Sequence, residues 1–243
     1  MSMMLFPLVV LIGILMVGGF VVALVLASKR EKGRKAALQA FAQAGGWLLA
    51  GRDDRWVGAF QGAPFGQGSD RHADDVCDRV VGGQRQVAFT HRFTTYETVT
   101  STDANGRTVT TQQRRDHAYR VLAVALPVPL GRVVVSRERL GDRLLRAFGG
   151  QDIEIEHADF NRRYRVRADD EKLAVDLLNP RTVERLLARD DASLRVDGGW
   201  VIVVDAGQLV PEFVEDRLRL VADLLAGVPR FVWLDHGYQP EQV

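Results

Sequence analysis

The chain lacks the residues that would cross-link it covalently. It has a single cysteine, Cys77, which excludes an internal disulfide framework and a cysteine-rich zinc site. It also lacks an excess of either charge, because 32 basic and 31 acidic residues leave a formal net charge of +1. Nucleic-acid-binding domains depend on a strong positive field. The composition therefore argues against nucleic acid as a partner.

The familiar signatures of nucleotide binding and hydrolysis are missing as well. The sequence contains neither GxxxxGK[ST] nor GxGxxG, and it has no GxSxG and no HExxH. We therefore expect no cofactor, and the sequence favours a non-enzymatic protein over an enzyme.

A long uncharged run is present near the N-terminus. Residues 5–27, LFPLVVLIGILMVGGFVVALVLA, would span about 35 Å as a helix, enough to cross a bilayer. The run predicts a single-pass transmembrane signal anchor. A cleaved signal peptide is the alternative, because Val25 and Ala27 suit a cleavage site before Ser28; the length of the run and the lack of Lys or Arg before it favour the anchor.

A basic cluster follows the apolar run directly, in the segment SKREKGRK. By the positive-inside rule it predicts a cell-membrane protein whose C-terminal side is cytoplasmic. Such a cluster can also attract anionic lipid. The candidate membrane-surface residues are Lys29, Arg30, Lys32, Arg34 and Lys35.

The rest of the chain predicts an α+β fold with a mostly antiparallel sheet, a long hairpin and packed helices. We divide the chain into residues 1–28, the transmembrane signal anchor; 29–50, a juxtamembrane basic segment and a helix stopped by Gly45–Gly46; 51–150, a β-rich part; and 151–243, a mixed α/β part. The boundary at 150 follows a predicted short helix over residues 140–148 that ends at Gly149–Gly150.

The clearest β signal is a hairpin over residues 85–127. Both arms are rich in Val, Thr, Phe and Tyr, and Asn105–Gly106 between them suits a two-residue type I′ turn. That turn predicts a register that pairs Phe89 with Leu122 and His91 with Arg120. The Thr-rich tip, from about Thr94 to Arg115, is then open to solvent. Its candidate partner-binding residues are Thr98, Thr100, Arg107 and Thr110.

The C-terminal part carries several local signals. Phe160, Tyr164 and Val166 suggest a half-buried strand, and Asp169 or Asp170 can cap a following helix. Asn179–Pro180 restarts a second helix. SLRV and WVIVV predict two strands joined by a turn at Asp197–Gly198–Gly199, and Pro211 opens the last helix.

These segments also carry a family resemblance. PFGQG, VVGGQRQVAFTHRF, LPVPLGRVVVSRE and DFNRRYRVRADDEKLAVDLLNPRTVERLL resemble a family of uncharacterised bacterial proteins with one N-terminal transmembrane helix and a soluble α+β domain. The resemblance covers most of the chain after residue 50. It implies architecture and membrane attachment, and it carries over no site.

Two groups of polar residues are weak candidates for chemistry. RHADDVCD contains His72, Asp75 and Cys77, which are all metal-ligand types, but their spacing matches no ligand motif and a charged strand edge explains them better. His91 and His117, with Asp116, suggest acid–base catalysis, yet the predicted register places the two histidines on opposite faces.

Three hypotheses for function follow. The first is a membrane-anchored, non-enzymatic binding or scaffolding module at the cytoplasmic face, with an unidentified protein partner. The second is a membrane-bound hydrolase that uses His117 with Asp116 or His91. The third is a domain that lies on the bilayer through its basic cluster.

Overall fold

The computed structural model describes residues 5–102, 107–137, 151–188 and 193–239, and in the first helix it describes side chains from residue 16 onward. The chain forms two compact units, Met1–Gly45 and Gly46–Val243. Each unit is described by itself below. The predicted turn at Asn105–Gly106 and the predicted helix over residues 140–148 lie outside the described residues.

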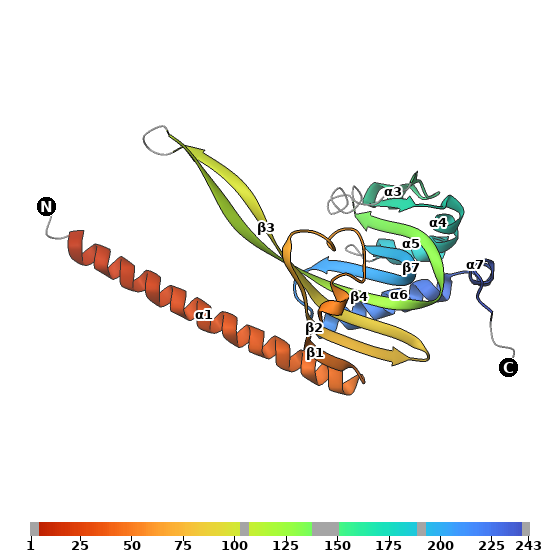
Figure 1. Ribbon diagram of the computed structural model, residues 1–243, viewed down its shortest axis with the longest axis horizontal. Coiled ribbons are helices and arrows are strands. Elements are labelled where there is room, and N and C mark those ends of the chain that lie inside the picture. Colours follow the sequence, from red (N-terminus) through yellow and green to blue (C-terminus); the bar gives the residue numbers. More distant parts are fainter. Residues whose placement is uncertain (1–4, 103–106, 138–150, 189–192, 240–243) are drawn as a thin grey trace. The chain divides into compact units, whose positions relative to one another are not determined.

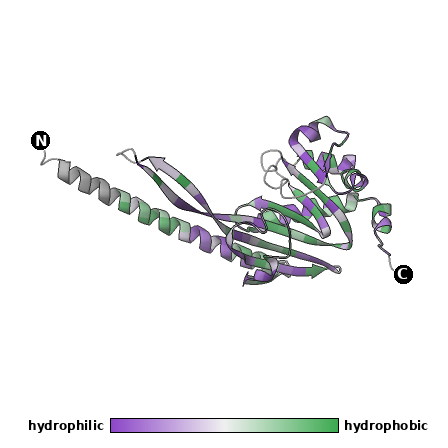
Figure 2. Ribbon diagram, turned by 45° about the horizontal axis from the view of Figure 1, so that its top comes forward, coloured by the Kyte–Doolittle hydropathy of each residue, from purple (hydrophilic) through white to green (hydrophobic). Residues whose placement is uncertain are grey.

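The first unit is one helix, α1 (Leu5–Ala44), which ends just before the glycine pair that was predicted to stop it. The predicted transmembrane, single-pass signal anchor is corrected by the structure. Within the described residues, none of the helices has the length of apolar sequence that a membrane span requires. In Figure 2, the described part of α1 changes from hydrophobic to hydrophilic residues toward its C-terminal end.

The second unit is built on a seven-stranded sheet in the order β1-β2-β3-β4-β6-β5, with β7 also paired to β4. All of its strand pairs are antiparallel. The strands are β1 (Leu48–Arg52), β2 (Ser69–Val81), β3 (Gln84–Thr102), β4 (Thr108–Arg137), β5 (Gln151–Ile153), β6 (Tyr164–Ala168) and β7 (Leu194–Ala206). The predicted α+β class with a mostly antiparallel sheet is confirmed.

The helices of this unit are short except for one. They are the 3-10 turn η1 (Asp54–Trp56) and the α-helices α3 (Ala158–Arg163), α4 (Glu171–Leu177), α5 (Pro180–Ala188), α6 (Pro211–Gly227) and α7 (Arg230–Asp235). Three predicted starts are confirmed: the Asp170 side chain caps α4, Asn179 Oδ1 accepts from the Thr182 amide at the start of α5, and Pro211 opens α6. The side-chain oxygens of Asp170 and Asn179 accept hydrogen bonds from free amides of the first helical turn. Proline at the first helical position has no amide hydrogen that needs a partner.

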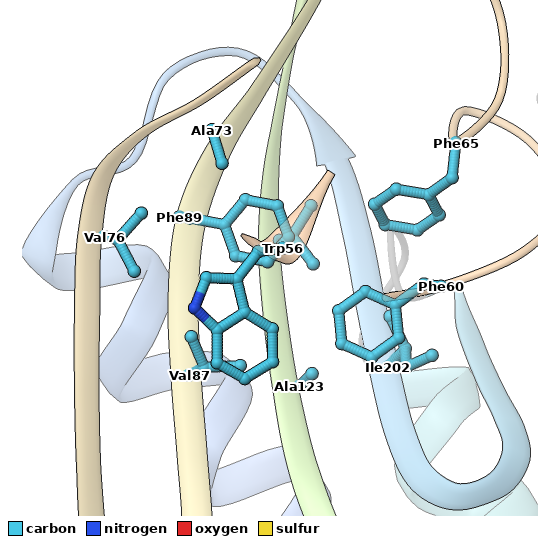
Figure 3. Packing of buried hydrophobic residues seen from close by; sticks show 10 residues of the cluster. Trp56, Phe60, Phe65, Ala73, Val76, Val87, Phe89, Ala123 and Ile202 are labelled. Atoms are coloured by element: carbon cyan, nitrogen blue, oxygen red, sulfur yellow. The ribbon is translucent and has the colours of Figure 1, made fainter. Parts of the chain in front are cut away.

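The central strands are covered on both faces. On one face, α6 lies across the sheet (Figure 1), and the Arg120 guanidinium lies 4.8 Å from the Phe213 ring centroid. On the other face, Trp56, Phe60 and Phe65 from the segment between β1 and β2 pack on Phe89 and Ile202 (Figure 3). Trp56 stacks on Phe60 with ring centroids 6.1 Å apart. The sheet therefore lies between α6 and this aromatic cap (Figure 1), which we define as Trp56, Phe60 and Phe65.

The register of the β3–β4 hairpin differs from the prediction by one residue. Phe89 faces Val121 and His91 faces Tyr119, rather than Leu122 and Arg120. The last described pair is Thr102 with Thr108. A one-residue shift reverses which residues of β4 share a face with those of β3. Here it places Phe89 and Val121 together under the aromatic cap.

Two local predictions in the C-terminal part are wrong. Phe160 lies in α3 rather than in a strand, because His157 caps a helical turn by accepting from the Phe160 amide, and β6 begins only at Tyr164. The segment around Asp197–Gly198–Gly199 is not a hairpin turn. It continues β7 through a register shift against β4, with Gly198 at φ 58°, a conformation that favours glycine.

Candidate functional site

The β3–β4 hairpin continues beyond the rest of the sheet as a projecting arm, which we define as residues 95–102 and 107–116. The pairing of β2 with β3 reaches Thr94, and that of β7 with β4 reaches Tyr119. Beyond these points, the described strands of the arm pair only with each other, from Thr95–Arg115 to Thr102–Thr108 (Figure 1). The side chains of residues 96–102 and 107–116 are all exposed.

The two faces of the arm differ in chemistry. Paired residues share a face, so the register places three predicted binding residues on one side, namely Thr98, Thr100 and Thr110. The other side carries Val99 and Val109, which are 42% and 44% exposed and lie diagonally across the two strands. The structure thus brings the predicted threonines together, and it shows an apolar pair on the opposite face that the sequence did not single out.

Charged residues lie on the arm and at its base. On the valine face, Arg115 Nε lies 2.7 Å from Glu97 Oε2. At the base, Asp116 Oδ1 accepts hydrogen bonds from Arg114 Nε and Thr94 Oγ1, both at 2.8 Å. The hydrogen bond from Arg114 is the main cause that lowers the pKa of Asp116. Arg107, the remaining predicted binding residue, is exposed at the start of the second strand of the arm.

The predicted catalytic group is not assembled as an acid–base pair. His117 and Asp116 are neighbours on β4 and so lie on opposite faces, and His117 Nε2 is 2.7 Å from Thr95 Oγ1. His91 shares a face with His117, contrary to the predicted register, but Phe93 stacks on the His117 ring between them, with centroids 4.7 Å apart. The three predicted residues are therefore not brought together as one acid–base group, and the hydrogen-bond partner of His117 is the Thr95 hydroxyl.

His91 on β3 is buried against the aromatic cap. It is fully buried, and its ring centroid lies 5.0 Å from that of Phe65. Burial lowers the pKa of His91 to about 4, the positive charges of Arg71 and His72 act in the same direction, and the Pro64 carbonyl opposes them. The imidazole is therefore neutral at physiological pH.

The predicted metal-ligand types on β2 are dispersed. Among the described residues, no group of three or more His, Cys, Asp or Glu side chains could hold a metal ion. His72 Nε2 lies 3.5 Å from Asp74 Oδ2, which also pairs with Arg92, whereas Cys77 is fully buried. Asp75 has a positive φ of 55°, at a register shift of the β2–β3 pair that redirects the following side chains.

The basic residues after the apolar stretch lie on α1, where Glu31 offsets part of their charge. Arg34 Nη2 lies 2.7 Å and Lys35 Nζ 3.9 Å from Glu31 Oε1. The other basic residues of the cluster are Lys29, Arg30 and Lys32. A lipid-binding role for this cluster stays a prediction.

The structure also shows a small cavity that the sequence did not reveal. Its volume is about 30 Å³, and its lining includes Ala63, Ser136, Ser193, Arg195, Ile202 and Val204. Arg195 is only 5% exposed. The one sequence signal for this site is an arginine inside the apolar run SLRV, which by alternation alone could equally face solvent.

Comparisons with known proteins give one informative result. No protein-family model matches the chain, and no curated protein sequence is significantly similar to it, which is consistent with the resemblance to an uncharacterised family. The crystal structure of the mycobacterial trehalose monomycolate transport factor A, TtfA, matches with a TM-score of 0.58 and 15% sequence identity, over 81% of this chain and 97% of that chain. At this identity, the likeness shows a shared fold.

Proposed function

We propose that this protein is a non-enzymatic binding module with an accessory role, and that it contacts a protein partner through its projecting arm. The observation that carries the proposal is that the arm pairs only with itself among the described strands, with its side chains open on both faces. Long exposed ribbons present unpaired backbone groups along both edges and are a common place for another chain to add a strand.

The valine face of the arm is the better contact surface. Val99 and Val109 form an apolar centre, and the Glu97–Arg115 ion pair lies beside it. Apolar centres flanked by polar groups are the usual arrangement of protein interfaces. The charges also discourage unspecific pairing of the arm with itself or with other strands. The threonine face offers hydroxyl groups for orientation.

The fold comparison supports an accessory role over an enzymatic one, because the matching structure is named a transport factor. The alternative hydrolase gains no support from the arrangement of its proposed residues. His91 is buried with a lowered pKa, and His117 and Asp116 lie on opposite faces.

The test combines site-specific photo-crosslinking with removal of the arm in the full-length protein. A photoreactive residue at Val99 is expected to crosslink to one partner in cells, whereas the same residue at Glu171, an exposed position on α4, is not. Replacing residues 96–114 with Asn-Gly joins Thr95 to Arg115, which are directly paired, through a two-residue turn. This variant is expected to fold normally and to lose the partner.

A matched pair of substitutions tests which face binds. Val99→Asp places a charge on the valine face, and Thr98→Asp places the same charge on the threonine face one residue away. We expect the first to abolish crosslinking from a probe at Val109 and the second to leave most of it. Equal crosslinking at the Val99 and Glu171 positions, or a complex that survives loss of the arm, would contradict the proposal.

A further inference from the structure

The small cavity lies on the face of the sheet that carries the aromatic cap. Val134 on β4 pairs with Arg195 on β7, and both line the cavity together with Ser136, two residues further along β4. Ile202 and Val204 on β7, and Ala63 from the segment between β1 and β2, add apolar lining. The site thus combines a mostly hydrocarbon lining with a few polar groups.

Two serine hydroxyls at this cavity have no hydrogen-bond partner. Ser136 is fully buried and Ser193 is 7% exposed, and in the part of the chain that the structure describes neither Oγ atom has a partner. Buried hydroxyl groups are almost always hydrogen-bonded, since leaving one without a partner is costly. Two such groups at one cavity indicate that a bound molecule accepts their hydrogen bonds.

Arg195 supplies a positive charge at the same place. Its Nη1 donates to the Gln61 carbonyl at 2.6 Å, and its guanidinium carbon lies 5.4 Å from the centroid of the Phe65 ring. Burial lowers the pKa of Arg195 to about 10, while Asp197 opposes that shift. Asp197 itself lies 3.5 Å from Arg132 Nε. The guanidinium still carries its charge at neutral pH, inside a largely apolar surrounding.

We propose that this cavity binds the carboxylate of a small or chain-bearing organic acid, with Ser136 and Ser193 donating to its oxygens beside Arg195. The volume of about 30 Å³ suits this group, since it holds about two water-sized atoms. A carboxylate has two oxygens, whereas sulfate and phosphate have four. A carboxylate also accepts hydrogen bonds only, which matches two hydroxyl donors and a guanidinium.

The test is a titration of the full-length protein with formate and acetate at constant ionic strength, followed by the backbone amide resonances of Ser136 and Ser193. We expect saturable shifts with both anions, none with acetamide and much weaker ones with sulfate. Hexanoate distinguishes the source of the carboxylate. If hexanoate binds at least tenfold tighter than acetate, the ligand is a chain-bearing acid, because the additional methylene groups bury apolar surface. If hexanoate binds equally or more weakly than acetate, the ligand is a small free acid.

Ser136→Ala gives the decisive comparison. It is expected to weaken acetate binding about tenfold, as loss of a hydrogen bond to a charged group does. The ligand-free variant should melt no lower than the wild type, because the substitution removes a buried hydroxyl that has no protein partner. Ser28→Ala, at an exposed position on α1, is the matched control and should change neither value. Absence of saturable shifts with all three acids, or equal affinity in Ser136→Ala, would overturn the proposal. The arm takes no part in this test, so the result is independent of the proposed protein partner.

Discussion

Arg217 on α6 donates to a single oxygen of Asp205 on β7, from Nε at 3.1 Å and from Nη2 at 2.9 Å. The side chains are 4% and 11% exposed, so this ion pair links the helix to the sheet away from most solvent. Thr90, Arg120 and Asp205 lie side by side across β3, β4 and β7, and Thr90 Oγ1 accepts from the Leu209 amide just before α6. Polar contacts therefore position α6 on this face of the sheet.

Removing one partner of that ion pair is expected to be strongly destabilising. Asp205→Ala leaves a buried guanidinium without this carboxylate, which should lower the free energy of unfolding by about 3 kcal/mol. Urea denaturation at pH 7 measures the loss. Glu215→Ala is the control, since the Arg219–Glu215 pair is exposed and should contribute less than about 1 kcal/mol. A similar loss in the two variants would show that the Asp205 contact is unimportant.

His91 should make stability depend on pH. Its folded pKa is about 4, below the ordinary value of 6.5, so the unfolded chain binds a proton more readily. Stability from this residue is complete above pH 6.5 and is lost as the pH falls toward 4, with about 2 kcal/mol gone at pH 5. Comparing urea midpoints at pH 8 and pH 5 tests this. His91→Phe should remove that part of the dependence; an unchanged profile in the variant would assign it to other groups.

Cys77 should be inert in the folded protein. It is fully buried, and burial is the main cause that raises the pKa of its thiol to about 12. Thiolate is the reactive form, so a maleimide at pH 7.5 should label Cys77 only in denaturant. Thr110→Cys in a Cys77→Ser background provides an exposed thiol on the arm as a positive control. Labelling of native wild-type protein at the control rate would contradict the burial of Cys77.

The aromatic cap should contribute strongly to stability. Phe60 is 6% exposed and contacts Trp56, Phe65 and Trp200, with its ring centroid 5.7 Å from that of Trp200. Phe60→Ala should cost about 3 to 5 kcal/mol, because it removes apolar contacts and leaves a cavity. Phe231→Ala is the control, since Phe231 is 45% exposed. Chemical denaturation monitored by tryptophan fluorescence would show the difference, and equal midpoints would contradict the role of the cap.

The sequence by itself determined the elements whose signals are local. The Asp170 cap, the Asn179–Pro180 helix start and the opening of α6 at Pro211 depend on side chains that satisfy or replace free amides within one turn. The β-rich hairpin with a polar, exposed end was predictable for the same reason, because β-branched residues and alternation act along a single strand.

Tertiary structure decided everything that depends on which face a residue occupies. The observed register of β3 with β4 differs by one residue from the predicted one, which puts His91 and His117 on one face and Phe89 opposite Val121. Because β7 pairs with β4 on both sides of Asp197–Gly198–Gly199, the strand continues where the sequence predicted a turn. The same pairing buried Arg195 beside Ser136. No local pattern marks that cavity, because its walls come from segments far apart in the chain.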